Sequence, residues 1–323
     1  MQLTHGLRRN TDSRRVGGVH NPDMVDTLRR LILTGIPAAA TCATLAEAAE
    51  PSSPMAPVAS GATDAPLADG FIPFADKRDK FNALFRFERD LRDQGTALST
   101  YQFLVFAVLQ GQRPQPVVRF EGMEYSYFRR VGAETWRIHA HNLSYPRDVT
   151  TGRFVSTVKN PFTGEMLQVQ PMRLMDDPGV LQSPKGYLQA NETKVNWHDS
   201  HFVARIEGDL VKAEHIRPAP EVWPTMFIES SVSSVTKREF DDPSITSLMY
   251  QTSGFYIFPF PAWVRMGDKT GHMLGAWNGR KIRGPQGLPR EFLARARSED
   301  AALLEPRWGE FDRPVSEAVR SAY

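Results

Sequence analysis

The sequence lacks the features that most often assign a function on their own. It has one cysteine, so it cannot form a disulfide within the chain. It contains no glycine-rich nucleotide loop, no Gly-x-Ser-x-Gly elbow and no His-Glu-x-x-His motif. These absences argue against the common nucleotide-binding and hydrolase classes, but they do not exclude enzymes that work inside barrels.

Neither sign of charge is in excess over the body of the chain. The net charge of +2 arises in residues 1–49, which hold six Lys or Arg and four Asp or Glu and leave 33 of each for the remainder. A neutral body predicts no basic surface, so nucleic acid is not an expected partner. The apolar share of 41% over 323 residues is enough for a substantial core.

Residues 1–49 are typical of a twin-arginine signal peptide. Arg29 and Arg30 precede a short apolar segment, and small residues at Ala46 and Ala48 have the spacing that a signal peptidase accepts. The apolar segment is too short for a comfortable membrane crossing, so no stable membrane insertion is expected. The pattern predicts export by the twin-arginine machinery and a periplasmic or secreted protein.

Strand patterns dominate residues 71–323, which we expect to form one domain after a disordered linker at residues 50–70 that is rich in Pro, Ala, Ser and Gly. Two similar turns place Gly152 and Gly164 where a positive φ is needed. The short and even turn spacing predicts a mainly β fold, with an antiparallel, barrel-like (lipocalin-like) sheet. Apolar, aromatic and alternating runs predict strands at residues 101–109, 117–130, 135–143, 194–207, 223–235, 247–260 and 270–276.

Along the sequence, one helix is expected before the strands and one after them. Apolar residues at helical spacing predict an N-terminal helix over residues 76–92. Pro289 begins a C-terminal helix that runs to Arg297. The tail that follows is predicted to wrap around the domain, anchored by Trp308 and Phe311.

Four short motifs stand in a recognisable order along the body. They are Arg-Phe-Glu-Gly at residues 119–122, Glu-Thr-Trp-Arg at 134–137, Lys-Asn-Pro-Phe-Thr-Gly-Glu at 159–165 and Gly-Ala-Trp-Asn-Gly-Arg-Lys at 275–281. Over about residues 76–312 this order resembles the bacterial and fungal family called domain of unknown function 1838. The resemblance implies no catalytic residue, because that family has no settled activity.

The chain departs from the family pattern after Tyr101. The resemblance implies a small residue there, often glycine, whereas this sequence has Gln102 and Phe103. If that strand lines a pocket, we expect the pocket to be filled differently.

Two histidines on one predicted strand form the first candidate site. His139 and His141 are two residues apart, so they share a face with Arg137. Cupin barrels present metal ligands as such a pair, but they place a glutamate a few residues later, where this chain has Ser144 and Tyr145. We therefore predict no metal site, and a metal site at His139 and His141 is kept as the alternative to a solvated or structural role.

A second cluster offers acid–base chemistry. Histidine titrates near neutral pH and a carboxylate can fix its tautomer, which favours His198 or His201, with Asp199, as the proton-transfer group. Tyr250 or Arg137 is expected to hold a developing oxyanion. The alternative is that the cluster is an ordinary polar strand end.

Aromatic residues around a few polar groups predict a concave wall for a small molecule. The residues expected to bind substrate are Tyr125, Tyr127, Phe227, Glu229, Tyr256, Phe258 and Trp263.

The sequence thus favours an exported enzyme that acts on a small apolar or aromatic molecule by acid–base chemistry of the lyase or isomerase type, with no cofactor. One alternative is a non-catalytic periplasmic binding protein for a hydrophobic small molecule. The other is a metal-dependent oxygenase.

Overall fold

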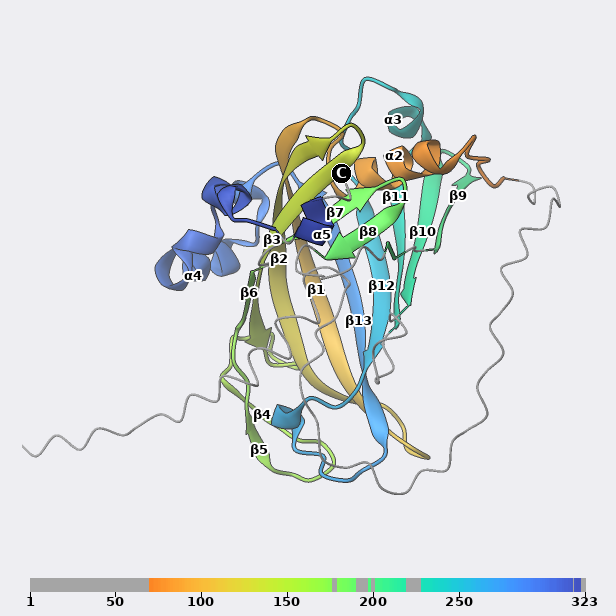
Figure 1. Cartoon of the computed structure of the whole chain (residues 1–323). Coiled ribbons are helices and arrows are strands. Elements are labelled where there is room, and N and C mark those ends of the chain that lie inside the picture. The colour runs from red at the N-terminus through yellow and green to blue at the C-terminus, as the bar shows by residue number, and fades with distance from the viewer. Residues whose placement is uncertain are drawn as a thin grey trace, which may run out of the picture.

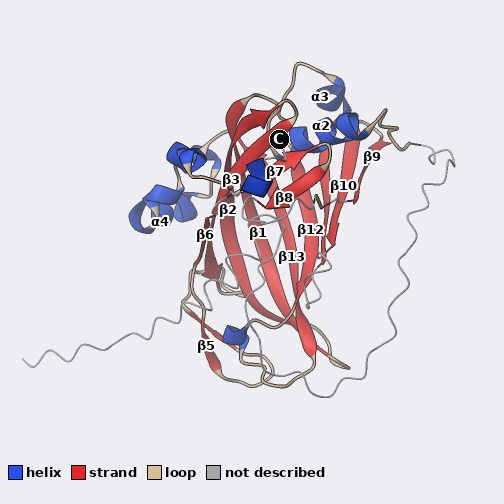
Figure 2. Cartoon of the chain, viewed as in Figure 1, coloured by secondary structure: helices blue, strands red, loops and turns tan. Residues whose placement is uncertain are grey.

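An antiparallel sheet makes up most of the structure (Figure 1). The computed structural model describes residues 70–175, 179–189, 197–198, 201–218, 228–315 and 317–320. Within these ranges eleven strands form one sheet in the order β8-β7-β3-β2-β1-β13-β12-β11-β10-β9, with β6 also paired to β3. Figure 2 shows how far strands outweigh helices. The predicted mainly antiparallel β fold is therefore confirmed. The predicted signal peptide at residues 1–49 lies outside the described residues.

The strands of the large sheet are β1 (Gln94–Leu109), β2 (Gln115–Gly132), β3 (Thr135–Arg147), β6 (Met172–Met175), β7 (Val180–Ser183), β8 (Gly186–Gln189), β9 (His201–Glu207), β10 (Leu210–Pro218), β11 (Ile228–Thr236), β12 (Gln251–Phe258) and β13 (Gly271–Ile282). The helices are α2 (Lys77–Glu88), α3 (Lys237–Asp241), α4 (Arg290–Glu299) and α5 (Glu317–Arg320), with 3-10 helices η1 (Ala262–Val264), η2 (Pro285–Gly287), η3 (Ala301–Leu303) and η4 (Trp308–Asp312).

Among the described residues, the two ends of the sheet do not close into a continuous ladder. They approach each other at one isolated bridge, where the backbones of Tyr187 in β8 and of His198, just ahead of β9, exchange hydrogen bonds of 3.0 and 2.9 Å. The predicted barrel-like shape is thus only loosely met, because a single bridge replaces a paired edge.

Alternation along the strands gives the sheet an inner and an outer face. β3 is buried at every position from Thr135 to Pro146, so both of its faces are covered. The outer face is covered by α4 and the segments that follow it, which Figure 1 shows beside β2 and β3. The inner face lines the space that the sheet encloses.

The predicted N-terminal helix forms as α2, which lies across one end of the sheet (Figure 1). It begins after Asp76, whose carboxylate accepts a hydrogen bond of 2.8 Å from the backbone N–H of Asp79. At its other end Lys281 of β13 donates to the carbonyl oxygens of Phe87 and Arg89, at 2.9 and 2.6 Å. Burial lowers the pKa of Lys281 to about 7.

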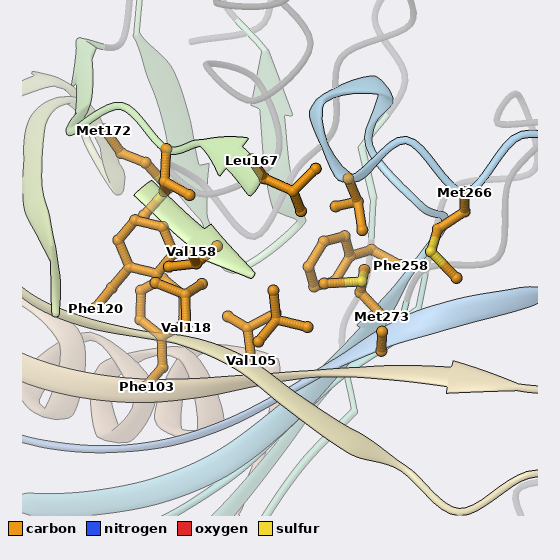
Figure 3. Close-up of a cluster of buried hydrophobic side chains, with 14 of the residues drawn as sticks. Phe103, Val105, Val118, Phe120, Val158, Leu167, Met172, Phe258, Met266 and Met273 are labelled. Carbon is orange, nitrogen blue, oxygen red and sulfur yellow. The ribbon is translucent and has the colours of Figure 1, made fainter. Parts of the chain in front are cut away.

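The opposite end of the sheet is filled by apolar side chains under a small second sheet of β4 (Thr157–Lys159) and β5 (Met166–Gln168). Figure 3 shows Phe103, Val105 and Phe120 of the large sheet facing Leu167 of β5. The two predicted turns flank β4, and Gly152 and Gly164 have φ of 69° and 76°, as expected.

The C-terminal predictions are also confirmed. Pro289 caps α4, which ends two residues beyond the predicted Arg297. The tail then packs onto β2 and β3 through η4, where the Trp308 and Phe311 rings lie 5.8 and 5.9 Å from the ring of Tyr127. Among the described helices, none has the length and apolar character that crossing a membrane requires.

Candidate functional site

A cavity of about 170 Å³ lies between the inner face of the sheet and the C-terminal half of α2. This is roughly ten times the space that one water molecule needs. Strand alternation sends every second side chain into it, so β1 contributes Tyr101 and Phe103, and β12 contributes Thr252 and Tyr256. The strand on which Gln102 departs from the family pattern therefore lines a pocket. The aromatic rings of Tyr101 and Phe103 fill that part of the pocket wall.

Glycines on neighbouring strands make room for the cavity's large rings. A Cβ atom on Gly275 of β13 would lie 2.6 Å from the ring of Tyr256, its partner across β12 and β13. A Cβ atom on Gly254 would lie 2.9 Å from the Trp277 ring and 2.2 Å from the Ser230 carbonyl oxygen. All three distances are too short for any larger residue, so these glycines set the shape of the wall.

A histidine–carboxylate pair forms one side of the cavity. Nδ1 of His215 in β10 lies 3.2 Å from Oε1 of Glu88, the last residue of α2, and both side chains are nearly buried. Gln182 of β7 approaches the other oxygen of Glu88 at 3.4 Å. In a neutral imidazole, a carboxylate beside Nδ1 favours the tautomer that carries its proton on that nitrogen. The pair has the composition that proton transfer requires.

Four lining residues have a buried polar atom with no hydrogen-bond partner within the described residues: Nε of Arg89, Oγ1 of Thr252, Oη of Tyr256 and Nε1 of Trp277. Burying a polar group without a partner costs roughly 1–3 kcal/mol. A polar group of a bound molecule could satisfy such atoms, which makes this wall a candidate binding surface.

Burial keeps the tyrosines of the cavity protonated. It raises the pKa of Tyr250 to about 12, and the hydroxyl of Tyr250 lies 3.3 Å from that of Ser99. It raises the pKa of Tyr256 well above the ordinary value, with Tyr101 and Glu229 adding to the effect. These phenols are therefore hydrogen-bond donors at neutral pH, as stabilisation of a developing oxyanion requires.

An ion pair lies on the side of the cavity nearest to the C-terminus of α2. Arg89 and Glu124 are 3.2 Å apart, and Ser126 donates to the same carboxylate at 2.9 Å. Glu229 of β11 lines the cavity as well. Acidic, basic and neutral polar groups therefore surround one apolar space, as in many small-molecule sites.

The predicted catalytic cluster lies apart from this cavity. His198 stacks on Tyr187 at a ring distance of 5.3 Å, and His201 is exposed at the start of β9. Neither is among the described lining residues, whereas Tyr250 is. Asp199 lies outside the described residues.

The predicted binding residues divide among three places. Glu229 and Tyr256 line the cavity. Phe258 and Trp263 belong to the apolar cluster at the other end of the sheet (Figure 3 shows Phe258). Phe227 lies outside the described residues. The two remaining residues, Tyr125 and Tyr127, face outward: Tyr125 packs against the cluster that includes α4 residues, and Tyr127 contacts η4.

The pair His139 and His141 also faces outward, where the C-terminal segment buries it. Tyr127 donates to the carboxylate of Glu310 in η4, and its oxygen lies 3.1 Å from Nε2 of His141. Nδ1 of His139 lies 3.5 Å from the same carboxylate. Burial lowers the pKa of His141 to about 4. No group of three or more His, Cys, Asp or Glu side chains in the described ranges could hold a metal ion.

Arg137 holds the same segment by its backbone. Its guanidinium donates to the carbonyl oxygens of Phe311 and Arg313, at 3.2 and 3.0 Å, and to that of Glu310 at 3.3 Å. The residue is 4% exposed. This side chain, predicted to hold an oxyanion, thus anchors the tail on the face opposite the cavity.

Sequence reasoning missed the residues that form the cavity's acid–base pair. His215 lies outside both histidine clusters, on a strand that is absent from those predicted above, and Glu88 resembles any charged residue of an amphipathic helix. The available signal was the alternation of Val211, Ala213 and His215 on one side of β10.

No family model matches the chain, and no curated protein matches it. The resemblance to the family called domain of unknown function 1838 therefore stays a prediction.

Proposed function

We propose that the protein is an enzyme that binds a small molecule with an aromatic or apolar body in the cavity and moves a proton of that molecule, in a lyase or isomerase step. The observation that carries this proposal is the pair of His215 and Glu88 on the cavity wall, 3.2 Å apart. Histidine exchanges protons near neutral pH, and the carboxylate holds its tautomer and orientation.

The roles of the other residues follow from their chemistry. Nε2 of His215 accepts the proton from the substrate and returns it to another atom. The hydroxyl of Tyr256 and the indole N–H of Trp277 donate to the oxygen on which negative charge develops. The rings of Tyr101 and Phe103 pack against the body of the substrate, and so they contribute to affinity more than to rate.

The test is conversion measured on matched variants. Mixtures of small aromatic and aliphatic compounds are incubated with the protein in D₂O, and mass spectrometry detects products or deuterium uptake. We expect His215→Gln to lower turnover by a factor of roughly a hundred to ten thousand. Glu88→Gln should lower it less and shift the pH profile, because the imidazole stays in place.

His201→Gln is the control, since His201 is exposed and outside the cavity. Full turnover in His215→Gln would refute the assignment. Loss of turnover in His201→Gln, together with full turnover in His215→Gln, would instead support the proton-transfer cluster of His198, Asp199 and His201 that the sequence favours. If compounds bind in the cavity and none is converted, the non-catalytic binding protein replaces the enzyme.

We also propose that the protein works after export, which rests on the pattern around Arg29 and Arg30. Replacing both with lysine should trap the protein in the cytoplasm, as cell fractionation would detect. Unchanged export of the double variant would disprove the twin-arginine interpretation.

A further inference from the structure

A second cleft lies on the other side of the histidine–carboxylate pair. It has a volume of about 90 Å³ and lies between α2, the β7–β8 hairpin and the edge of β9 and β10. Figure 1 shows the hairpin beside α2. The cleft and the cavity share Leu84, Glu88, Phe202 and His215. The pair therefore borders both spaces, and we call the cavity the inner compartment and the cleft the outer compartment.

The outer compartment is basic. Lys77 and Lys80 of α2 and Lys185 of the β7–β8 turn line it. Lys77 and Lys185 are exposed and Lys80 is half-buried. In the part of the chain that the structure describes, none of the three forms an ion pair, and Lys185 lies over the ring of Trp197 at 5.9 Å.

The nearby carboxylates have other hydrogen-bond partners. Asp76 caps α2, and Asp79 accepts from the backbone N–H of Ala75 at 3.1 Å. Glu88 is paired with His215. Three lysines from two separate elements thus line one cleft, in a body that carries equal numbers of basic and acidic residues. Such a concentration of positive charge attracts anions to the cleft.

We propose that cavity and cleft form one site with two compartments, and that its ligand is a small organic acid. The carboxylate of the acid lies among the three lysines, its apolar or aromatic body lies in the cavity, and the atoms between them pass His215. This inference rests on the proposed function and adds the substrate class to it.

The experiment compares acids with their own neutral amides. A library of aromatic and aliphatic carboxylic acids, each paired with its primary amide, is screened by thermal shift, and the affinities of hits are measured by calorimetry. We expect acids to bind about tenfold more tightly than amides at low salt. In about 0.5 M salt the preference should shrink, because the lysines are close to solvent.

Lys77→Gln with Lys80→Gln should remove most of this preference and leave amide affinity unchanged. The matched control, Lys159→Gln with Lys269→Gln, removes two exposed lysines elsewhere and should keep it. Equal binding of acids and amides by the wild type would overturn the inference and leave the proposed function standing, as would a preference that survives in Lys77→Gln with Lys80→Gln.

A cavity-filling variant tests the proposed function separately. Ser231 lines the cavity but not the cleft, so Ser231→Leu should abolish binding of acid and amide alike. If both still bind to Ser231→Leu, or if no compound of the library binds to the wild type, the proposed function fails together with the inference.

Discussion

The outer face of β2 and β3 and the inner face of β10 to β13 both bury polar side chains, and they differ in what those side chains meet. On the outer face, Tyr127, His141 and Arg137 contact Glu310 and backbone carbonyl groups of the C-terminal segment. On the inner face, the polar atoms of Tyr256 and Trp277 meet no partner within the described residues.

The difference separates two reasons for a buried polar residue. Desolvation costs about the same on both faces, so a partner is needed in each case. On the outer face the chain supplies that partner from its own tail, and the polar groups fix where the tail docks. On the inner face the described residues supply no such partner, which is the basis for the proposed binding of a small molecule.

The largest effect on stability is expected for Arg137→Met. This change leaves three carbonyl groups of the tail, of which that of Glu310 is buried, without their donor, and we expect the free energy of unfolding to fall by about 3 kcal/mol. Urea denaturation measures the loss. Arg113→Met, at an exposed position, is the control. An equal loss in both variants would mean that Arg137 does not hold the tail.

The next prediction concerns acid stability. Burial lowers the pKa of His141 from 6.5 to about 4, so between these values the unfolded chain binds a proton that the folded one does not. Stability should therefore decrease as the pH falls from 6.5 to 4, by up to about 3 kcal/mol. His141→Gln should lack this contribution, and denaturation of both proteins at pH 7 and pH 4 measures it. Parallel pH profiles would contradict the assignment.

One substitution made on both faces should have opposite signs. Tyr127→Phe removes a hydroxyl that bonds to Glu310 and should destabilise by about 1.5 kcal/mol. Tyr256→Phe removes a buried hydroxyl that has no partner among the described residues, and it should stabilise the ligand-free protein by up to about 1 kcal/mol. Thermal unfolding compares them. Equal losses at both positions would erase the distinction between the two faces.

The smallest expected effect is that of Thr252→Val. The two side chains have similar shapes, and the lost hydroxyl has no partner among the described residues, so stability should rise by about 0.5 kcal/mol. Ligand affinity should fall, because the cavity loses a polar contact. A gain in stability without any loss of affinity would place the ligand away from β12.

Much of the fold could be predicted because its causes are local. The alternation from Thr135 to Leu143 reports two faces, and the glycines at 152 and 164 report turns. Strand β10 was missed because Lys212 and Glu214 interrupt its few apolar residues, a pattern that an exposed loop also shows. His198 and His201, which are close in sequence, are not among the described residues that line the cavity, because nearness in sequence does not bring side chains to one cavity.

By itself the sequence determined that β3 has one polar and one apolar side, where the turns lie, and where α2 and α4 begin, because φ preferences, caps and side-chain periodicity act within a few residues. Only the tertiary structure decided that the polar side with His139 and His141 lies under the tail, and that Glu88 meets His215 at the wall of a cavity. Those contacts join segments far apart in the chain, and the free energy that selects them comes from burying whole faces together, which no short stretch of sequence encodes.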